Sequence, residues 1–199
     1  MAITSIKTGS SFTNLVKYDS FLGPNSAYVP PAFESIATVT ATGGQTTLSF
    51  TSIPQTYTHL QIRGIARYSV VGGTDDNLYM RFNGDTGSNY PTHWIDGNGS
   101  TVSAANIAPW DRMLIGKITA GSAGANMFGA CIIDIHDYAS TTKNKTVRHI
   151  AGDDMNGSGD VWLGSDLWIN TSAINQITMF CSGIFASGST FALYGIKGA

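Results

Sequence analysis

Residues 174–196 constrain the fold of this chain more than any other stretch. They read INQITMFCSGIFASGSTFALYGI, and apolar side chains occupy every second position through Ile177, Met179 and Cys181 and again through Phe191 and Leu193. A period of two is the pattern of β-strands, and the small and polar residues between the two runs are typical of a turn, so the segment predicts a β-hairpin. A hairpin is not stable alone, and we expect this one to lie centrally in a sheet whose other strands come from earlier in the chain.

The composition indicates that the remaining chain supplies strands rather than helices. Charged residues make up 12% of the 199 positions, whereas soluble domains average about 25%. Glu34 is the only glutamate, and surface helices are built largely from Glu, Lys and Arg. Short alternating segments separated by turn residues recur from residue 33 onward. We therefore predict an all-β fold, a single antiparallel β-sandwich over residues 33–199 with a jelly-roll-like order of about ten strands.

Turn residues between the alternating segments predict two further hairpins. Residues 33–41 and 45–50 flank Thr42-Gly43-Gly44, and glycine adopts the positive φ of tight turns without strain. Residues 57–68 are expected to pair with residues 78–83. In these two segments the side chains predicted to face the core are Leu60, Ile62, Gly64, Ala66, Leu78, Met80 and Phe82.

Other segments are assigned by their apolar content. Residues 127–138 are apolar on both faces, which predicts a central strand, and Trp162 and Trp168 are expected in the core. Residues 84–111 carry many turn signals, so we predict a long loop, and loops of this length inside a domain are often functional.

Residues 1–32 differ from the rest because they show neither helical nor strand periodicity. Isolated aromatic residues stand among Gly, Ser, Asn and Pro. The segment is either a flexible tail or an extended N-terminal arm that becomes ordered on a neighbouring molecule. In the second interpretation the anchoring residues are Phe12, Tyr18, Phe21, Tyr28 and Pro30.

Charge and cysteine content exclude several classes of function. The net charge is −2, and Lys and Arg are scattered, so we expect no nucleic-acid partner. The first residues lack a signal-peptide core, and no window approaches the roughly 18 apolar residues of a membrane span, so we expect synthesis in a cytoplasm and no membrane insertion. Cys131 and Cys181 lie in strand patterns without metal-ligand spacing, which favours two buried free thiols over a disulfide.

Two polar clusters have alternative interpretations. Residues 154–160 place Asp154, Asn156, Ser158 and Asp160 around a glycine turn, which resembles a Ca²⁺ loop but lacks the bidentate Glu of a helical one, so a polar turn is the preferred interpretation. Asp134, His136 and Asp137 could serve acid–base chemistry, but no nucleophile elbow or zinc pair accompanies them. We therefore predict no catalytic residues, no metal site and no cofactor.

The predicted loop at 84–111 holds the candidate ligand contacts. Exposed aromatic rings beside Asp, Asn and His side chains are a common arrangement for binding sugars, because the ring covers C–H groups while the polar groups bond hydroxyls. Core packing of the tryptophans is the alternative. The candidate receptor contacts are Tyr90, His93, Trp94, Asp96, Asn98 and Trp110.

Several short sequence segments resemble segments of small virion proteins of tailed bacteriophages, particularly phages of marine and freshwater cyanobacteria. These segments lie at residues 18–22, 27–31, 33–37, 52–63, 81–85, 141–146 and 188–196. This resemblance implies a β-sandwich subunit located in the virion and assembled in the host cytoplasm. Its partners would be copies of itself, for which we expect a homotrimer, and other virion proteins.

The resemblance leaves the place in the particle open. The preferred expectation is a tail fibre or appendage subunit that contributes to attachment to a host surface glycan. The alternative is a capsid decoration protein that stabilises the head and binds no receptor. A polysaccharide-degrading enzyme is the third choice, because the chain shows no paired-carboxylate motif.

Overall fold

The computed structural model describes residues 32–198, which contain twelve strands and no helix. The predicted arm, with Phe12, Tyr18, Phe21, Tyr28 and Pro30, lies outside the described residues. Within residues 32–198 no helix has the length and apolar character needed to cross a membrane. The all-β prediction is confirmed for this part of the chain.

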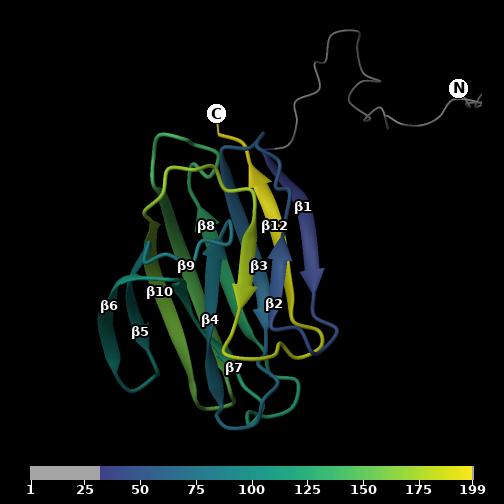
Figure 1. The fold of residues 1–199 in the computed structure, drawn as a ribbon. Coiled ribbons are helices and arrows are strands. Elements are labelled where there is room, and N and C mark those ends of the chain that lie inside the picture. Colours follow the sequence, from purple (N-terminus) through teal and green to yellow (C-terminus); the bar gives the residue numbers. More distant parts are fainter. Residues whose placement is uncertain (1–31, 199) are drawn as a thin grey trace, which may run out of the picture. The chain divides into compact units, whose positions relative to one another are not determined.

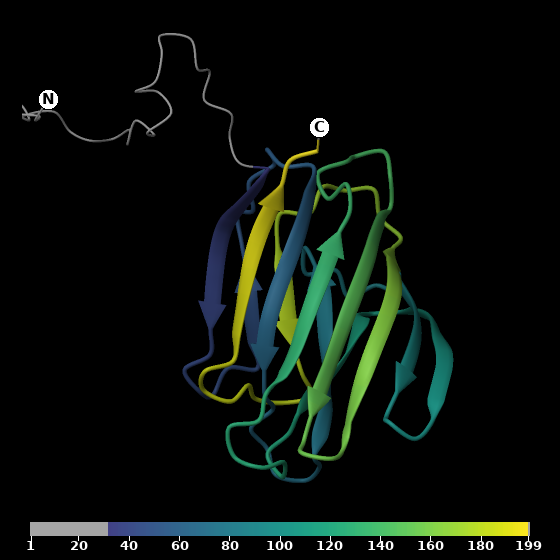
Figure 2. The same cartoon turned by 180° about the vertical axis from the view of Figure 1, so that it is seen from behind.

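The strands form two antiparallel sheets packed face to face (Figures 1 and 2). The large sheet has the order β1 (Phe33–Thr40), β12 (Thr190–Ile196), β3 (His59–Ala66), β8 (Gly129–Ile135), β9 (Lys145–Asp154), β10 (Gly159–Trp168), β5 (Tyr90–Gly97) and β6 (Val102–Trp110). The small sheet has the order β2 (Thr47–Phe50), β11 (Ile177–Phe180), β4 (Asp75–Phe82) and β7 (Met113–Thr119). The β-sandwich is therefore confirmed, whereas this eight-plus-four order does not establish the finer jelly-roll assignment.

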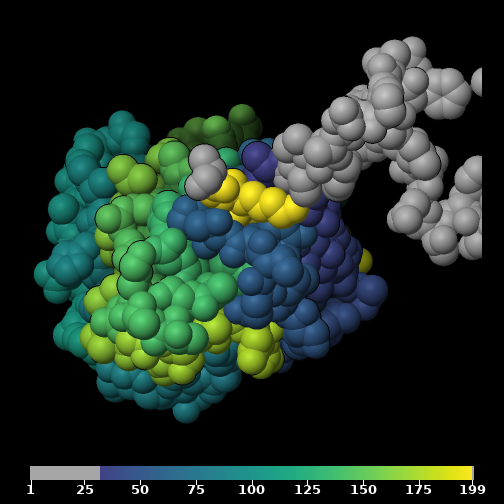
Figure 3. Space-filling view, turned by 90° about the horizontal axis from the view of Figure 1, so that it is seen from above, coloured from purple at the N-terminus to yellow at the C-terminus, as the bar shows by residue number. Residues whose placement is uncertain are grey.

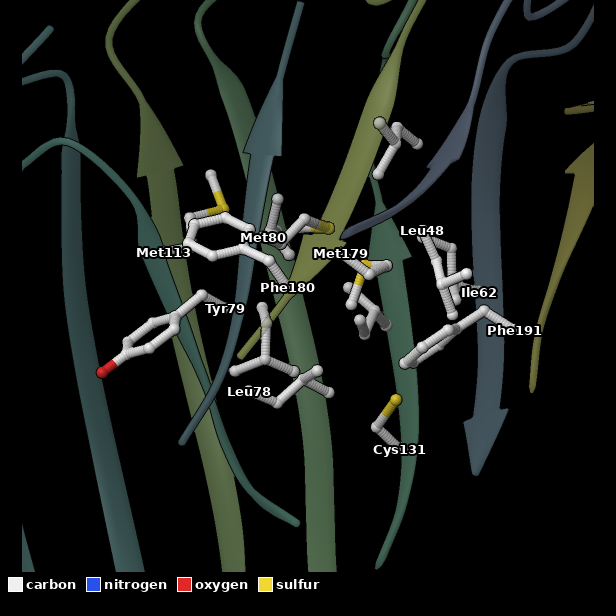
Figure 4. Close-up of a cluster of buried hydrophobic side chains, with 14 of the residues drawn as sticks. Leu48, Ile62, Leu78, Tyr79, Met80, Met113, Cys131, Met179, Phe180 and Phe191 are labelled. Carbon is white, nitrogen blue, oxygen red and sulfur yellow. The ribbon is translucent and has the colours of Figure 1, made fainter. Parts of the chain in front are cut away.

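The core lies between the two sheets. Figure 4 shows Leu48, Met80 and Met179 of the small sheet facing Ile62 and Phe191 of the large one. The inward positions predicted for β3 and β4 are confirmed, because Leu60, Ile62, Leu78, Met80 and Phe82 have no exposed surface and Ala66 is buried. Trp162 and Trp168 are also core residues, as predicted.

The predicted hairpin at 174–196 is wrong, although both of its strands are central. β11 lies between β2 and β4, and β12 lies between β1 and β3, so the two strands belong to different sheets. Each strand already has two partners, and the connecting residues 181–189 cross from one sheet to the other. Phe185 in this connection is fully buried and packs edge-on against Phe191, which makes the crossing part of the core.

The other two predicted hairpins are wrong for the same reason. β1 pairs with β12 whereas β2 pairs with β11, and β3 pairs with β12 and β8 whereas β4 pairs with β11 and β7. Turn residues between two strands mark a reversal of direction. They do not distinguish a hairpin within one sheet from an arch between two sheets.

Residues 84–111 are not a loop, because they contain β5 and β6. These strands form a hairpin around Asn98 and Gly99, and Gly99 has a φ of 84° that suits glycine. The prediction for residues 127–138 is confirmed, since β8 lies between β3 and β9 in the middle of the large sheet.

Hydrogen bonds join the end of β12 to the residues that precede β1 and β3. The backbone N–H of Thr58 donates to the carbonyl of Ile196, and that of Lys197 donates to Ala32. Figure 3 looks onto this end, where the yellow C-terminal residues lie between the start of β1 and the residues that precede β3.

The two cysteines are free and buried, which confirms the prediction of buried thiols. Burial raises the pKa of Cys131 to about 12 and that of Cys181 to about 11. Both thiols therefore stay protonated and unreactive near neutral pH.

Candidate functional site

The outer face of the large sheet carries a continuous line of aliphatic side chains. The strand registers place Ile132 beside Ile150, Ile150 beside Leu163, Leu163 beside Ile95 and Ile95 beside Ala104. The four larger side chains are 39%, 48%, 55% and 46% exposed in the order Ile132, Ile150, Leu163 and Ile95. We call these five residues the apolar row, and they cross β8, β9, β10, β5 and β6.

A polar row runs parallel to the apolar row, two residues away from it on each strand. Its members, again in register, are Asp134, Arg148, Ser165, His93 and Asn106. Arg148 Nη1 donates to Ser165 Oγ at 2.6 Å, and Gln61 Nε2 donates to Asp134 Oδ1 at 2.7 Å. These two hydrogen bonds link β9 to β10 and β3 to β8 across the outer face.

An open groove of about 540 Å³ lies where the two rows meet. Side chains of both rows line it on β9, β10, β5 and β6: His93, Ile95, Ala104, Asn106, Arg148, Leu163 and Ser165. The groove therefore joins an aliphatic floor to hydrogen-bonding groups. It suits noncovalent contact with a surface that is partly apolar and partly hydroxyl- or amide-bearing.

Strand alternation separates the residues that the sequence placed in one loop site. His93 is exposed in the polar row, but Trp94 and Asp96 point to the opposite face of β5. The Trp94 ring stacks on Trp162 with centroids 5.3 Å apart, and its Nε1 donates to Asp96 Oδ1 at 3.0 Å. Trp94 adjoins the groove, but its ring is partly buried and packs against the core.

Tyr90 does not reach the surface, which corrects its assignment as a receptor contact. Its side chain is fully buried, and its hydroxyl lies within hydrogen-bonding distance of the Phe82 backbone and the Asp85 carbonyl. Burial raises the pKa of this phenol well above its usual range. Tyr90 packs with Phe82 and Trp168 as a core residue.

Asn98 and Trp110 lie at the two ends of the β5–β6 hairpin. Asn98 Oδ1 accepts hydrogen bonds from the backbone N–H groups of Ser100 and Thr101, so the side chain shapes the turn. Trp110 is 37% exposed and meets Tyr79 edge-on, with centroids 5.7 Å apart. Of the six predicted contacts, only His93 lines the groove with its side chain on the outer face.

Trp110 belongs to an aromatic–arginine cluster on the outer face of the small sheet. The Arg112 guanidinium lies 4.6 Å from the Trp110 ring centroid and 5.2 Å from that of Tyr79. Asp111 accepts hydrogen bonds from Arg112 Nε at 2.7 Å and from an Arg81 Nη at 2.7 Å. The hydrogen bond from Arg112 holds the pKa of Asp111 below its ordinary value of 3.8.

Sequence reasoning missed six of these seven groove residues: Ile95, Ala104, Asn106, Arg148, Leu163 and Ser165. Arg148, Leu163 and Ser165 lie on β9 and β10, which alternate buried and more exposed positions, and Val161 and Leu163 on β10 are exposed on the face opposite Trp162. The sequence did contain a signal for these residues, because β10 has apolar residues at both odd and even positions. Such a strand is apolar on both of its faces, which indicates a second contact face.

A buried contact between an imidazole and a carboxyl group lies beneath the groove. His149 Nε2 lies 3.1 Å from Asp166 Oδ2, and both side chains are fully buried on the inner face of β9 and β10. Gly164 makes room for the imidazole, because a Cβ at this position would overlap His149 Nε2. The pair therefore supports the strands that carry the groove without contacting it.

The acidic residues near 154–160 do not converge on one point. Asp154 Oδ1 accepts from the N–H of Asn156 and shapes the turn, whereas Asp160 turns inward and pairs with Lys117 at 2.9 Å. Burial raises the pKa of the neighbouring Asp153. Among residues 32–198 no three His, Cys, Asp or Glu side chains are placed to hold a metal ion.

The second polar cluster forms surface ion pairs. Asp137 pairs with Lys143 at 2.6 Å and lies 3.6 Å from His59 Nδ1. The hydrogen bond from Lys143 lowers the pKa of Asp137. Asp134, on the other face of the strand end, bonds Gln61 instead. These residues tie strand ends together.

Comparison with models of known protein families and with curated proteins finds no match for this chain.

Proposed function

We propose that this chain is a structural subunit of a tailed-phage particle, acting as a tail fibre or appendage subunit that contributes to host attachment. The resemblance of its sequence segments to such proteins supports the proposal, and the apolar row is the observation that carries it. Exposed aliphatic side chains that run across five strands are typical of a surface that contacts another protein. The partners would be copies of the same chain and other virion proteins.

Incorporation into particles tests the proposal. Particles assembled with Ile150→Ser plus Leu163→Ser are expected to contain several-fold less of the protein than wild-type particles, because the apolar contact is lost. Ala37→Ser, on the exposed part of β1, is the matched control and should incorporate normally. Purified particles that lack the wild-type protein would refute the proposal.

The alternative is that the same subunit lies on the head of the particle, as a capsid decoration protein. The observation that favours it is the aliphatic lining of the groove, because the Trp94 ring stacks on Trp162, Trp110 packs against Tyr79, and protein contacts do not require aromatic rings. A labelled antibody against this chain, viewed on purified particles by electron microscopy, distinguishes the two locations. Label on the tail supports the appendage, and label on the head supports the decoration protein.

The polar row supports a contact with a host glycan as part of the appendage function. His93, Asn106 and Ser165 offer hydrogen-bonding groups beside the apolar floor, and this is the arrangement that a sugar ring requires. Host surface polysaccharide should bind the wild-type protein and lose binding to His93→Ala plus Asn106→Ala. Thr38→Ala, another exposed polar position, should bind as the wild type does.

A further inference from the structure

The edges of the two sheets are protected to very different degrees. Unpaired strand edges recruit further strands unless they are short, covered, bulged or charged. β2 has only four residues, and β7 is buried against the large sheet. β1 contains Glu34 and an irregular register between Ser35 and Ala37. Three of the four edges thus carry a recognisable obstacle to strand addition.

β6 carries none of these obstacles over most of its length. Among residues 32–198 it pairs only with β5, and every one of its residues except Ile107 is exposed. Its sequence, VSAANIAPW, contains no charged residue, and Val102 is 74% exposed. Its register with β5 is regular from Val102 to Ile107, and Pro109 and a register shift interrupt only its end. Residues 102–108 therefore form an open edge.

The composition of this edge fits a second copy of itself. In an antiparallel pair related by a two-fold axis, the residue at the centre of the strand faces its own copy, so a charge there would face the same charge. Residues 102–108 have no charge to repel, and their side chains near the centre are small. The midpoint of this window is Ala105, whose methyl group allows close approach.

We propose that β6 pairs with β6 of a second copy of this chain, antiparallel and with Ala105 nearest the two-fold axis. The two large sheets then continue into each other, and the two grooves, each of which includes Ala104 and Asn106, lie side by side across the axis. The inference goes beyond the proposed virion role and concerns the purified chain alone. It predicts a dimer, in contrast to the trimer expected from the resemblance.

Light scattering and cysteine cross-linking of the full chain test the pairing. The wild-type mass should approach that of a dimer as concentration rises. Ala105→Lys should weaken dimerisation by about tenfold or more, because like charges then face each other. Ala37→Lys, the same change on the opposite edge of the large sheet, should leave the mass unchanged.

Single cysteines at positions 103–107 locate the axis. On oxidation, disulfide-linked dimers should form fastest at or next to position 105 and fall off on both sides, and Ala37→Cys should not cross-link. Cys131 and Cys181 are buried and give no background in the folded protein. Circular dichroism spectra that match the wild type show that a variant is folded.

Several results would overturn the pairing. They are a wild-type mass that stays monomeric or reaches a trimer, a dimer that Ala105→Lys leaves intact, and cross-linking at position 37 instead of 105. Backbone amides of residues 103–107 that resist hydrogen exchange equally at all concentrations would also overturn it, because another part of the same chain would then cover the edge. None of these results depends on where the protein lies in a particle.

Discussion

Individual residues in this protein are placed by the alternation of strands, which sends neighbours to opposite faces. His93 and Trp94 are adjacent in sequence, yet one lies in the polar row and the other stacks on Trp162. The same alternation sets Gly164 against the His149 imidazole on the inner face, below the groove. Single substitutions therefore test which face a residue serves.

Gly164→Ala should destabilise the fold. The added methyl group would overlap the buried His149 ring, and relieving the overlap should cost about 1–3 kcal/mol of unfolding free energy. Gly97→Ala is the matched control in the same sheet, because its Cβ would meet nothing closer than 3.8 Å. Urea denaturation measures both variants, and equal stability of the two would contradict the close packing of the imidazole against Gly164.

Asp111 should make stability depend on pH. Its pKa in the folded protein lies below the ordinary 3.8 because Arg112 donates to the carboxylate. A lowered pKa contributes stability above the ordinary value, and this contribution is lost as the pH falls through the folded pKa. Asp111→Asn should therefore be less stable than the wild type at pH 7, with the difference vanishing at strongly acidic pH. A difference that is constant with pH would refute this origin.

Among the elements, the β5–β6 hairpin stands apart. Figure 1 shows β5 and β6 at the margin of the large sheet, beyond the small sheet, and the inner-face residues Ser103 and Ala105 are exposed. The hairpin is less deeply packed into the core than β8 or β9, so its turn contributes a larger share of its local stability. The open edge belongs to this hairpin, and the candidate groove extends from it onto β10 and β9.

Asn98→Ala should loosen the β5–β6 hairpin and leave the centre of the large sheet intact. The variant loses the acceptor for the N–H groups of Ser100 and Thr101, which costs about 1 kcal/mol in comparable side-chain caps. Amide hydrogen exchange should speed up in β5 and β6 by several-fold and stay unchanged in β8. Uniform acceleration across all strands would indicate a global effect instead.

At the scale of the described sandwich, eight strands face four. The small sheet covers one face of the large sheet, and Figure 2 looks onto the opposite face. That face carries the exposed side chains of the apolar row. The two faces of β8 illustrate the difference, because Ile133 is fully buried whereas its neighbour Ile132 is exposed.

Ile150→Ser plus Leu163→Ser should change the surface without changing the fold. Substitutions at exposed positions of this kind change the unfolding free energy by about 0.5 kcal/mol or less each. Ile133→Ser should instead lower the unfolding free energy by about 2–5 kcal/mol, because it puts a hydroxyl and a cavity into the core. Thermal unfolding measures stability, and binding of a hydrophobic dye should fall for the double variant. Unchanged dye binding would show that the apolar row is not the accessible patch.

Composition and period-two patterning were enough to establish the all-β class, the inward positions of β3 and β4, the central place of β8 and the core roles of Trp162 and Trp168. These properties depend on local alternation, which a sequence displays directly. The partners of each strand do not, because β11 and β12 are apolar enough to occupy the centre of either sheet. Pairing is decided by contacts between residues far apart in sequence, such as those of β12 with β1 and β3 and those of β11 with β2 and β4. These contacts place the two strands of the predicted hairpin at 174–196 in different sheets. The groove could not be predicted from the sequence for the same reason. Only the register of four strands brings Arg148, Ser165, His93 and Asn106 into one row.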